Sequence, residues 1–161
     1  MRSMVVAVLA GVASFGVAQA FAQQGYDPAP RIAAQKEAMK ALSFLDGEWR
    51  GSAKSLRDDG GWHSMVQTER VGPMLDGAVK VVEGRGHEAD GRLSFNAFAV
   101  ISYDPDKKTY SMRSYTAGRM GDYQIVPTPT GFTWEIPAGP QMAIHYEATV
   151  NDGVWTEVGT R

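Results

Sequence analysis

The segment from Leu93 to Tyr115 constrains the fold most, because it has the pattern of two long β-strands joined by a tight turn. The turn is predicted at Tyr103-Asp104-Pro105-Asp106-Lys107, where proline presets its own φ angle and aspartate can accept hydrogen bonds from the backbone ahead of it. The first strand is apolar at most positions, so we expect it to be buried on both faces. A hairpin of this kind predicts an antiparallel sheet.

Short strands separated by turns follow one another through most of the remaining chain. Asp58-Asp59-Gly60-Gly61 and Asn151-Asp152-Gly153 are typical hairpin turns. Prolines on either side of residues 132–136 are expected to confine that segment to a short, edge-like strand. About nine strands are predicted, over residues 48–57, 62–71, 78–83, the hairpin 93–115, 122–126, 132–136, 141–150 and 154–160. This spacing is typical of an up-and-down barrel or a sandwich, and we predict a single all-β antiparallel barrel.

One helix is predicted, over residues 31–45, ahead of the strands. Its apolar residues recur at helical spacing, Pro30 suits its start and Gly47 suits its end. We expect the helix to pack on the barrel or across one mouth of it. The alternative is a helix that binds a partner.

The N-terminus has the pattern of a cleaved secretory signal peptide. A short basic region at Arg2 precedes the apolar run from Met4 to Ala18, and small-x-small cleavage sites follow, the last ending at Ala22. We therefore assign residues 1–22 to a signal peptide, 23–30 to a mobile lead-in and 31–161 to one domain, and we expect a secreted or periplasmic protein with no membrane span after cleavage. The alternative is that residues 4–22 remain as a membrane anchor.

Composition excludes several classes of function. The chain has no cysteine, so it has neither disulfides, thiolate metal sites nor a cysteine nucleophile. Its formal net charge of −2 and its lack of basic runs argue against nucleic acid as a partner. The sequence has no Gly-x-Ser-x-Gly motif, no metal-ligand spacing and no other motif that requires a cofactor. We therefore expect no catalysis, no metal and no cofactor.

The order of helix, Leu-x-Gly-x-Trp-x-Gly and first strand at Leu45–Gly51 resembles the calycins, the lipocalin-like barrels. The chain from about Leu42 onward is similar, more specifically, to a bacterial family of secreted, lipocalin-like domains with no established activity. The resemblance rests on Asn96-Ala97-Phe98, Ser102-Tyr103-Asp104-Pro105, Arg113-Ser114-Tyr115, Gly121-Asp122-Tyr123 and Gly153-Val154-Trp155-Thr156-Glu157. It implies a lipocalin-like barrel, and it also implies one further strand past Arg161, so that a domain ending there is C-terminally incomplete or leaves an open barrel edge.

Polar residues on otherwise apolar strands are the candidate site. We hypothesise that Arg113 pairs with Glu69 or Glu83 inside the barrel and forms the polar end of an apolar pocket, since a buried carboxylate needs a partner. The alternative is that these groups point outward. Aromatic side chains would complete the pocket, unless they simply form the core. The predicted ligand-binding residues are Trp49, Glu69, Glu83, Asn96, Phe98, Arg113, Tyr115, Trp134 and Tyr146.

Three functions are compatible with these patterns. The leading one is a binding module without catalysis for a small hydrophobic ligand, lipidic or aromatic, because an aromatic-lined barrel with a few polar groups is a common form of ligand site. The second is a haem-binding or enzymatic barrel that uses His145 or the Arg113 group. For His145, a solvent-facing strand position beside Glu147 and Thr149 is the simpler interpretation. The third is a structural or interaction domain with a filled interior.

Overall fold

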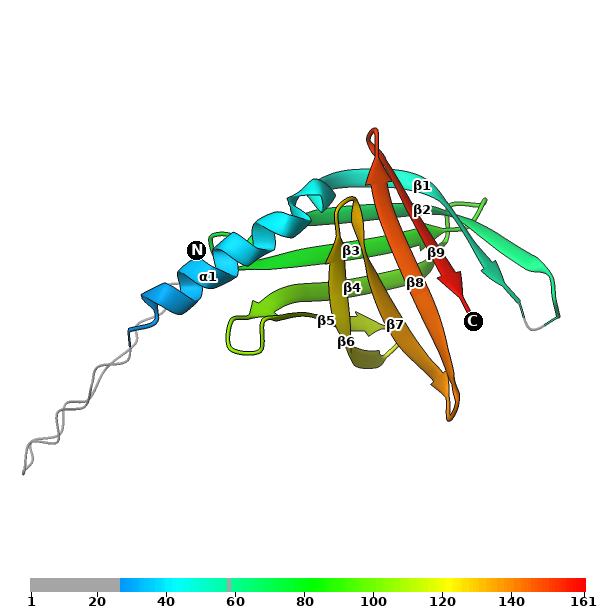
Figure 1. Ribbon diagram of the computed structural model, residues 1–161. Helices are drawn as coiled ribbons and strands as arrows, with labels where there is room; N and C mark the ends of the chain where they lie inside the picture. The colour runs from blue at the N-terminus through cyan, green and yellow to red at the C-terminus, as the bar shows by residue number, and fades with distance from the viewer. Residues whose placement is uncertain (1–26, 58) are drawn as a thin grey trace, which may run out of the picture.

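The computed structural model describes residues 27–57 and 59–161, so the predicted signal peptide lies outside the described residues. These residues form one nine-stranded antiparallel sheet in sequence order, curled into a nearly closed barrel behind a single helical segment (Figure 1). The all-β barrel prediction is confirmed. The strands are β1 (Gly47–Leu56), β2 (Trp62–Met74), β3 (Val79–His87), β4 (Leu93–Asp104), β5 (Thr109–Thr116), β6 (Arg119–Thr128), β7 (Gly131–Gly139), β8 (Met142–Asn151) and β9 (Val154–Thr160).

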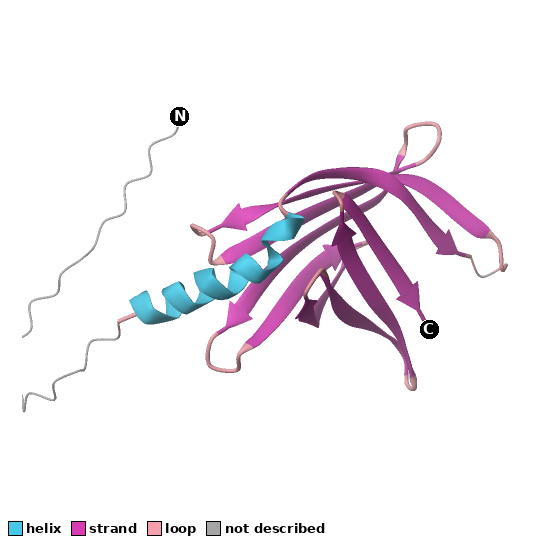
Figure 2. Ribbon diagram, turned by 45° about the horizontal axis from the view of Figure 1, so that its top comes forward, coloured by secondary structure: helices cyan, strands magenta, loops and turns pink. Residues whose placement is uncertain are grey.

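The helical segment consists of α1 (Ala29–Met39) followed directly by the 3₁₀ helix η1 (Lys40–Leu45). It begins two residues earlier than predicted, with Pro28 as its N-cap and Pro30 in its first turn. The segment packs across the ends of β3 and β4, as Figure 2 shows. The side-chain amide of Gln35 donates to the carbonyl of Tyr103, and the hydroxyl of Tyr110 donates to the carbonyl of Ala38. The helix therefore packs on the barrel, as expected.

The packed core lies at the end of the barrel that this helical segment covers. Leu42 and Leu45 from η1 are buried together with Ile101 of β4 and Ile125 of β6. Around them pack Met39, Val71, Ala99, Met112, Phe132 and Ala148. The register places all of these strand residues on one face of the wall, which is the inner face. Burial of this apolar surface stabilises the helix-covered end.

The central hairpin has the predicted turn but not the predicted burial. Asp104 accepts hydrogen bonds from the backbone N–H groups of Asp106 and Lys107, which fixes the turn. β4, however, is buried on its inner face only, and Phe98 on the other face is 43% exposed. The expectation of burial on both faces is therefore wrong, because the wall is a single layer of sheet with no second layer outside β4.

Several strands are longer than predicted. β2 continues through Gly72 and Pro73, and β3 continues to His87 where a loop was expected. β7 is neither short nor at an edge, because it pairs with both β6 and β8. The prolines are tolerated by their position: Pro127 lies beyond the last pair with β5, and Pro137 lies beyond the last pair with β6. Each proline therefore has only one paired neighbour.

The barrel wall is interrupted at two places. No ladder joins β1 to β9, although the rings of Trp49 and Trp155 meet edge-to-face across this seam with centroids 5.7 Å apart. β6 and β7 pair only from Ile125 opposite Trp134 to Thr128 opposite Gly131, and then separate. Among the described residues, no helix has the length and apolar character needed to cross a bilayer.

Candidate functional site

The inner face of the barrel is polar and partly exposed away from the helix-covered end. Gln67 and Glu69 of β2, Tyr123 of β6, Trp134 of β7 and Tyr146 of β8 all have intermediate burial, and Glu157 of β9 is exposed. Alternation along each strand places these six side chains on the same face as the buried core. We call this set the inner polar surface. It contrasts with the packed, apolar end beneath the helix.

Glu69 is held on β2 by its strand neighbour and by a glycine opposite. The amide of Gln67 donates to Glu69 Oε1 at 2.7 Å. Gly84 of β3 faces Glu69 across the ladder, and a Cβ at Gly84 would lie 2.8 Å from both carboxylate oxygens. The absence of a side chain at Gly84 therefore makes room for the Glu69 carboxylate.

Glu157 of β9 accepts a hydrogen bond from an aromatic cluster on β6, β7 and β8. The indole N–H of Trp134 donates to Glu157 Oε1 at 2.8 Å. The Trp134 ring stacks on Tyr146, with centroids 4.5 Å apart and planes at 16°, and the Tyr123 ring meets Trp134 edge-on at 5.3 Å. Gly159 lies opposite Tyr146 and gives its ring room, since a Cβ there would lie 2.7 Å from it. Trp134 thus joins the carboxyl group to an aromatic surface.

Both inner carboxyl groups favour the protonated form more than an ordinary glutamate does. The Glu157 residue is exposed along the edge strand, but the protein groups around its carboxyl group partly desolvate it and so raise its pKa, which the hydrogen bond from Trp134 opposes only in part. Burial also raises the pKa of Glu69, the bond from Gln67 lowers it, and the charge of nearby Glu157 raises it further. Burial likewise raises the pKa of the Tyr146 hydroxyl. Among the described residues, no lysine, arginine or histidine forms an ion pair with Glu69 or Glu157.

The predicted ligand-binding residues divide between the two faces. Trp49, Glu69, Trp134 and Tyr146 lie on the inner face, and the ring contacts and the Glu69–Glu157 proximity bring them together with Trp155 and Glu157. The remaining five lie on the outer face, on positions that alternate with the inner ones: Glu83, Asn96, Phe98, Arg113 and Tyr115. Ligand binding by any of the nine stays a prediction.

The expected internal pairing of Arg113 with Glu69 or Glu83 is wrong. Arg113 Nε and Nη2 donate to the two carboxylate oxygens of Asp122, at 2.6 and 2.7 Å, on the solvent side of β5 and β6. The register explains this, because Arg113 lies directly opposite Asp122 and one residue out of phase with buried Met112.

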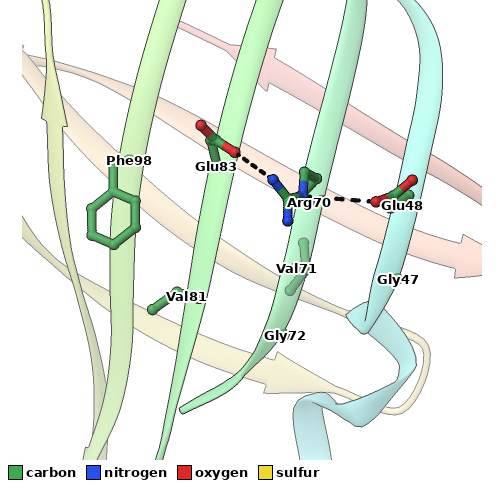
Figure 3. Close-up of a pocket in the computed structure, with 8 residues that line it drawn as sticks. All are labelled: Gly47, Glu48, Arg70, Val71, Gly72, Val81, Glu83 and Phe98. Atoms are coloured by element: carbon green, nitrogen blue, oxygen red, sulfur yellow. Dashed lines mark hydrogen bonds and ion pairs between the residues drawn. The ribbon is translucent and has the colours of Figure 1, made fainter. Parts of the chain in front are cut away.

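The outer face carries a row of ion pairs and an open hollow. Arg70 lies between Glu48 and Glu83 on neighbouring strands, 3.7 Å from the first and 3.4 Å from the second (Figure 3). Phe98 and Val81 border this hollow, which has a volume of about 530 Å³. Each of its three charged side chains takes part in an ion pair.

His145 also lies on the outer face. Its Nδ1 is 3.2 Å from Glu135 of the adjacent strand, and its side chain is 48% exposed. His145 therefore has the solvent-facing position that was the simpler interpretation of its sequence context. The haem hypothesis required His145 inside the barrel, and the structure does not place it there. Among the described residues, no cluster of three or more potential metal-binding side chains is found.

A second hollow, of about 600 Å³, opens where β6 and β7 separate. Its lining includes Tyr123 and Trp134 of the inner polar surface, together with Pro137 and Met142 at its rim. Because Trp134 is also the donor to Glu157, this hollow borders the inner polar surface from the side.

Sequence reasoning missed Glu157 as a site residue, although a signal for it exists. In the last strand, Trp155, Glu157 and Gly159 alternate with Val154, Thr156 and Val158. The β-branched set has the composition expected of a core face, yet Val154 and Val158 are exposed. The large-to-small order from Trp155 to Gly159 matches that of Trp49 and Gly51 on β1, which is an inner face. Comparison of these two strands would have identified Glu157.

Comparisons with protein-family models, curated proteins and solved structures gave no match. The nearly closed nine-stranded antiparallel barrel with one helix is consistent with a lipocalin-like fold.

Proposed function

We propose that the protein is a binding module that holds a small, largely apolar molecule against the inner polar surface. One observation carries this proposal: the inner face is filled by apolar side chains beneath the helix but is partly exposed, aromatic and polar beyond them. Ligand sites typically combine an apolar or aromatic lining with a few polar groups that fix orientation. Trp134 and Tyr146 would supply the lining, and Gln67, Glu69 and Glu157 would supply the polar groups.

Native mass spectrometry of the purified protein, compared with its denatured mass, tests this function. A discrete extra mass that is lost on denaturation, found directly or after incubation with a mixed lipid extract, is the expected result. Ser114 and Ser111 of β5 offer a matched pair of variants, because Ser114 lies on the inner face and Ser111 on the outer face. Ser114→Phe should lose the extra mass, and Ser111→Phe should keep it. Loss in both variants, or no bound mass in the wild type, would overturn the proposal.

We further propose that the protein acts outside the cytoplasm, after cleavage of residues 1–22. The basic residue, apolar run and small-residue cleavage site in this segment support the proposal. Expression of the full chain in a bacterium with two membranes, followed by mass measurement of the periplasmic fraction, tests it. A chain that begins at Gln23 is the expected product. A cytoplasmic chain that retains Met4–Ala22 would contradict it.

A further inference from the structure

The inner polar surface holds two acidic groups without a cation, and this bears on the kind of molecule that it accepts. Other carboxylates of the wall have partners: Asp122 has Arg113, Glu83 has Arg70 and Arg85, and Asp46 has buried Lys80. Arg161 is close enough to lower the pKa of the Tyr146 hydroxyl, but it forms no ion pair with Glu69 or Glu157. Within residues 27–57 and 59–161, these two acids therefore have no ion-pair partner.

The aromatic rings beside these acids are suited to a cation. Trp134 and Tyr146 stack on each other, and Trp134 donates directly to Glu157. An ammonium group is attracted both to carboxylates and to the faces of tryptophan and tyrosine rings. An apolar group attached to the ammonium would lie on the same rings.

A buried donor without a partner in the described part of the chain lies at the seam, on the same strand face as Glu157. The indole N–H of Trp155 is buried and has no hydrogen-bond partner among the described residues. Trp155 lies two residues before Glu157 on the same strand face, and its ring contacts Trp49, the cross-strand neighbour of Glu69. Buried donors are normally satisfied, so an orphaned one requires an explanation. An oxygen acceptor on a ligand would satisfy it.

A hollow lies beside the aromatic part of this surface. The hollow between β6 and β7, of about 600 Å³, has Trp134 and Tyr123 in its lining, and the indole of Trp134 donates to Glu157. This volume falls within the range of sites for small organic molecules, roughly 300 to 1,000 Å³.

We propose, on the basis of the function proposed above, that the ligand is an organic amine whose ammonium group binds between Glu69 and Glu157 while its apolar part lies on Trp134 and Tyr146. An oxygen acceptor on the same molecule would bind the Trp155 indole. Burial raises the pKa of both acids, and a cation placed between them would oppose that shift by favouring the charged carboxylates.

Three probes that share one carbon skeleton test the proposal: 4-phenylbutylammonium, 4-phenylbutanol and 4-phenylbutyrate, titrated at pH 7.5 by calorimetry and by the ¹H–¹⁵N signal of the Trp134 indole. The amine should bind about tenfold or more tightly than the alcohol, and the carboxylate should bind most weakly. Glu157→Gln and Glu69→Gln should each remove most of the preference for the amine and leave alcohol binding within about threefold of wild type. Glu83→Gln, the same change on the outer face, should alter none of these values.

The outcomes separate this inference from the function on which it rests. If the alcohol or the carboxylate binds as tightly as the amine, or if the two inner variants keep the amine preference, the protein binds small molecules but the amine inference is wrong. If none of the three probes binds, the amine inference is also wrong, and the native mass measurement alone then decides whether the proposed function stands.

Discussion

The carboxylates on the two faces of the barrel wall differ in what they contact. On the outer face, Arg113 lowers the pKa of Asp122 by hydrogen bonds and charge. On the inner face, enclosure without a cation raises the pKa of Glu69 and Glu157. The outer carboxylate Asp122 is thus paired with a cation in contact with solvent. Glu69 and Glu157 on the inner face have no such partner among the described residues. This difference is the basis of our proposal that a ligand binds at the inner face rather than at the outer one.

The largest expected effect comes from Lys80, a buried cation on the inner face that does have an acidic partner. Lys80 is 3% exposed, lies on the inner face at the helix-covered end, and forms an ion pair with Asp46. Asp46→Ala leaves a buried ammonium group unpaired and should lower the free energy of unfolding by about 3 kcal/mol in urea denaturation. Lys80→Met, which removes the charge and keeps the apolar stem, should cost clearly less. Equal losses in both variants would mean that packing, rather than charge, accounts for the effect.

The next largest effect is the change in stability with pH that Glu69 and Glu157 cause. The pKa of Glu69 and that of Glu157 are raised in the folded state above the ordinary value of 4.5, so the folded protein binds more protons than the unfolded chain. Their contribution is therefore most favourable below pH 4.5 and is lost as the pH rises through the folded pKa values. Glutamine does not ionise, so Glu69→Gln and Glu157→Gln should each raise the melting temperature at pH 7 by a few degrees. Above pH 4.5, the melting temperature of each variant should fall less steeply with pH than that of the wild type.

The outer acid Glu83 is the matched control for those melts. It contacts Arg70 and Arg85, so Glu83→Gln removes favourable pairs and should leave the melting temperature at pH 7 unchanged or slightly lower. A rise in melting temperature for Glu83→Gln equal to that of the inner variants would abolish the distinction between the two faces.

A smaller effect is expected at Gly84. A Cβ at this position would meet both oxygens of Glu69, which must then move. Gly84→Ala should destabilise the protein by about 1 kcal/mol, mainly through this displacement. Glu69→Ala removes the atoms that this Cβ would meet, so Gly84→Ala should cost clearly less in that background, and a double-mutant cycle measures the coupling. Strict additivity would show that Gly84 is not there to accommodate the carboxylate.

The smallest effect is expected at Arg113, which was predicted to pair with Glu69 or Glu83 inside the barrel and instead pairs with Asp122 on the outer face. Arg113 and Asp122 are about half exposed, so Arg113→Met should leave the melting temperature at neutral pH within the scatter of replicate melts. Any stabilisation from Asp122 is present above its ordinary pKa of 3.8 and is lost as the pH falls through its lowered folded value. If Arg113→Met instead lowered the melting temperature strongly at pH 7, in high salt as well as in low salt, the Arg113–Asp122 pair would have to be buried rather than solvent-exposed.

The sequence predicted the architecture well because alternation and turn chemistry are local. The central turn, for example, followed from Asp104 and Pro105. The composition of the site was harder to predict. Alternation does not say which face turns inward, so Arg113 and Phe98 were placed inside with Glu69. Proximity across the seam between β1 and β9 depends on barrel curvature, and that is why Glu157 was missed.

The most direct test of the central claim is a measurement of the pKa values of Glu69 and Glu157 themselves. Carboxyl ¹³C chemical shifts, followed from pH 3 to 9 in wild type and assigned with Glu69→Gln and Glu157→Gln, report each group separately. Both should titrate above the ordinary value of 4.5, and Glu69 should titrate at a lower pH once Glu157 is replaced. Ordinary or lowered values for both would contradict the account, because they would show that the inner acids already have the counter-charge that we assign to a ligand.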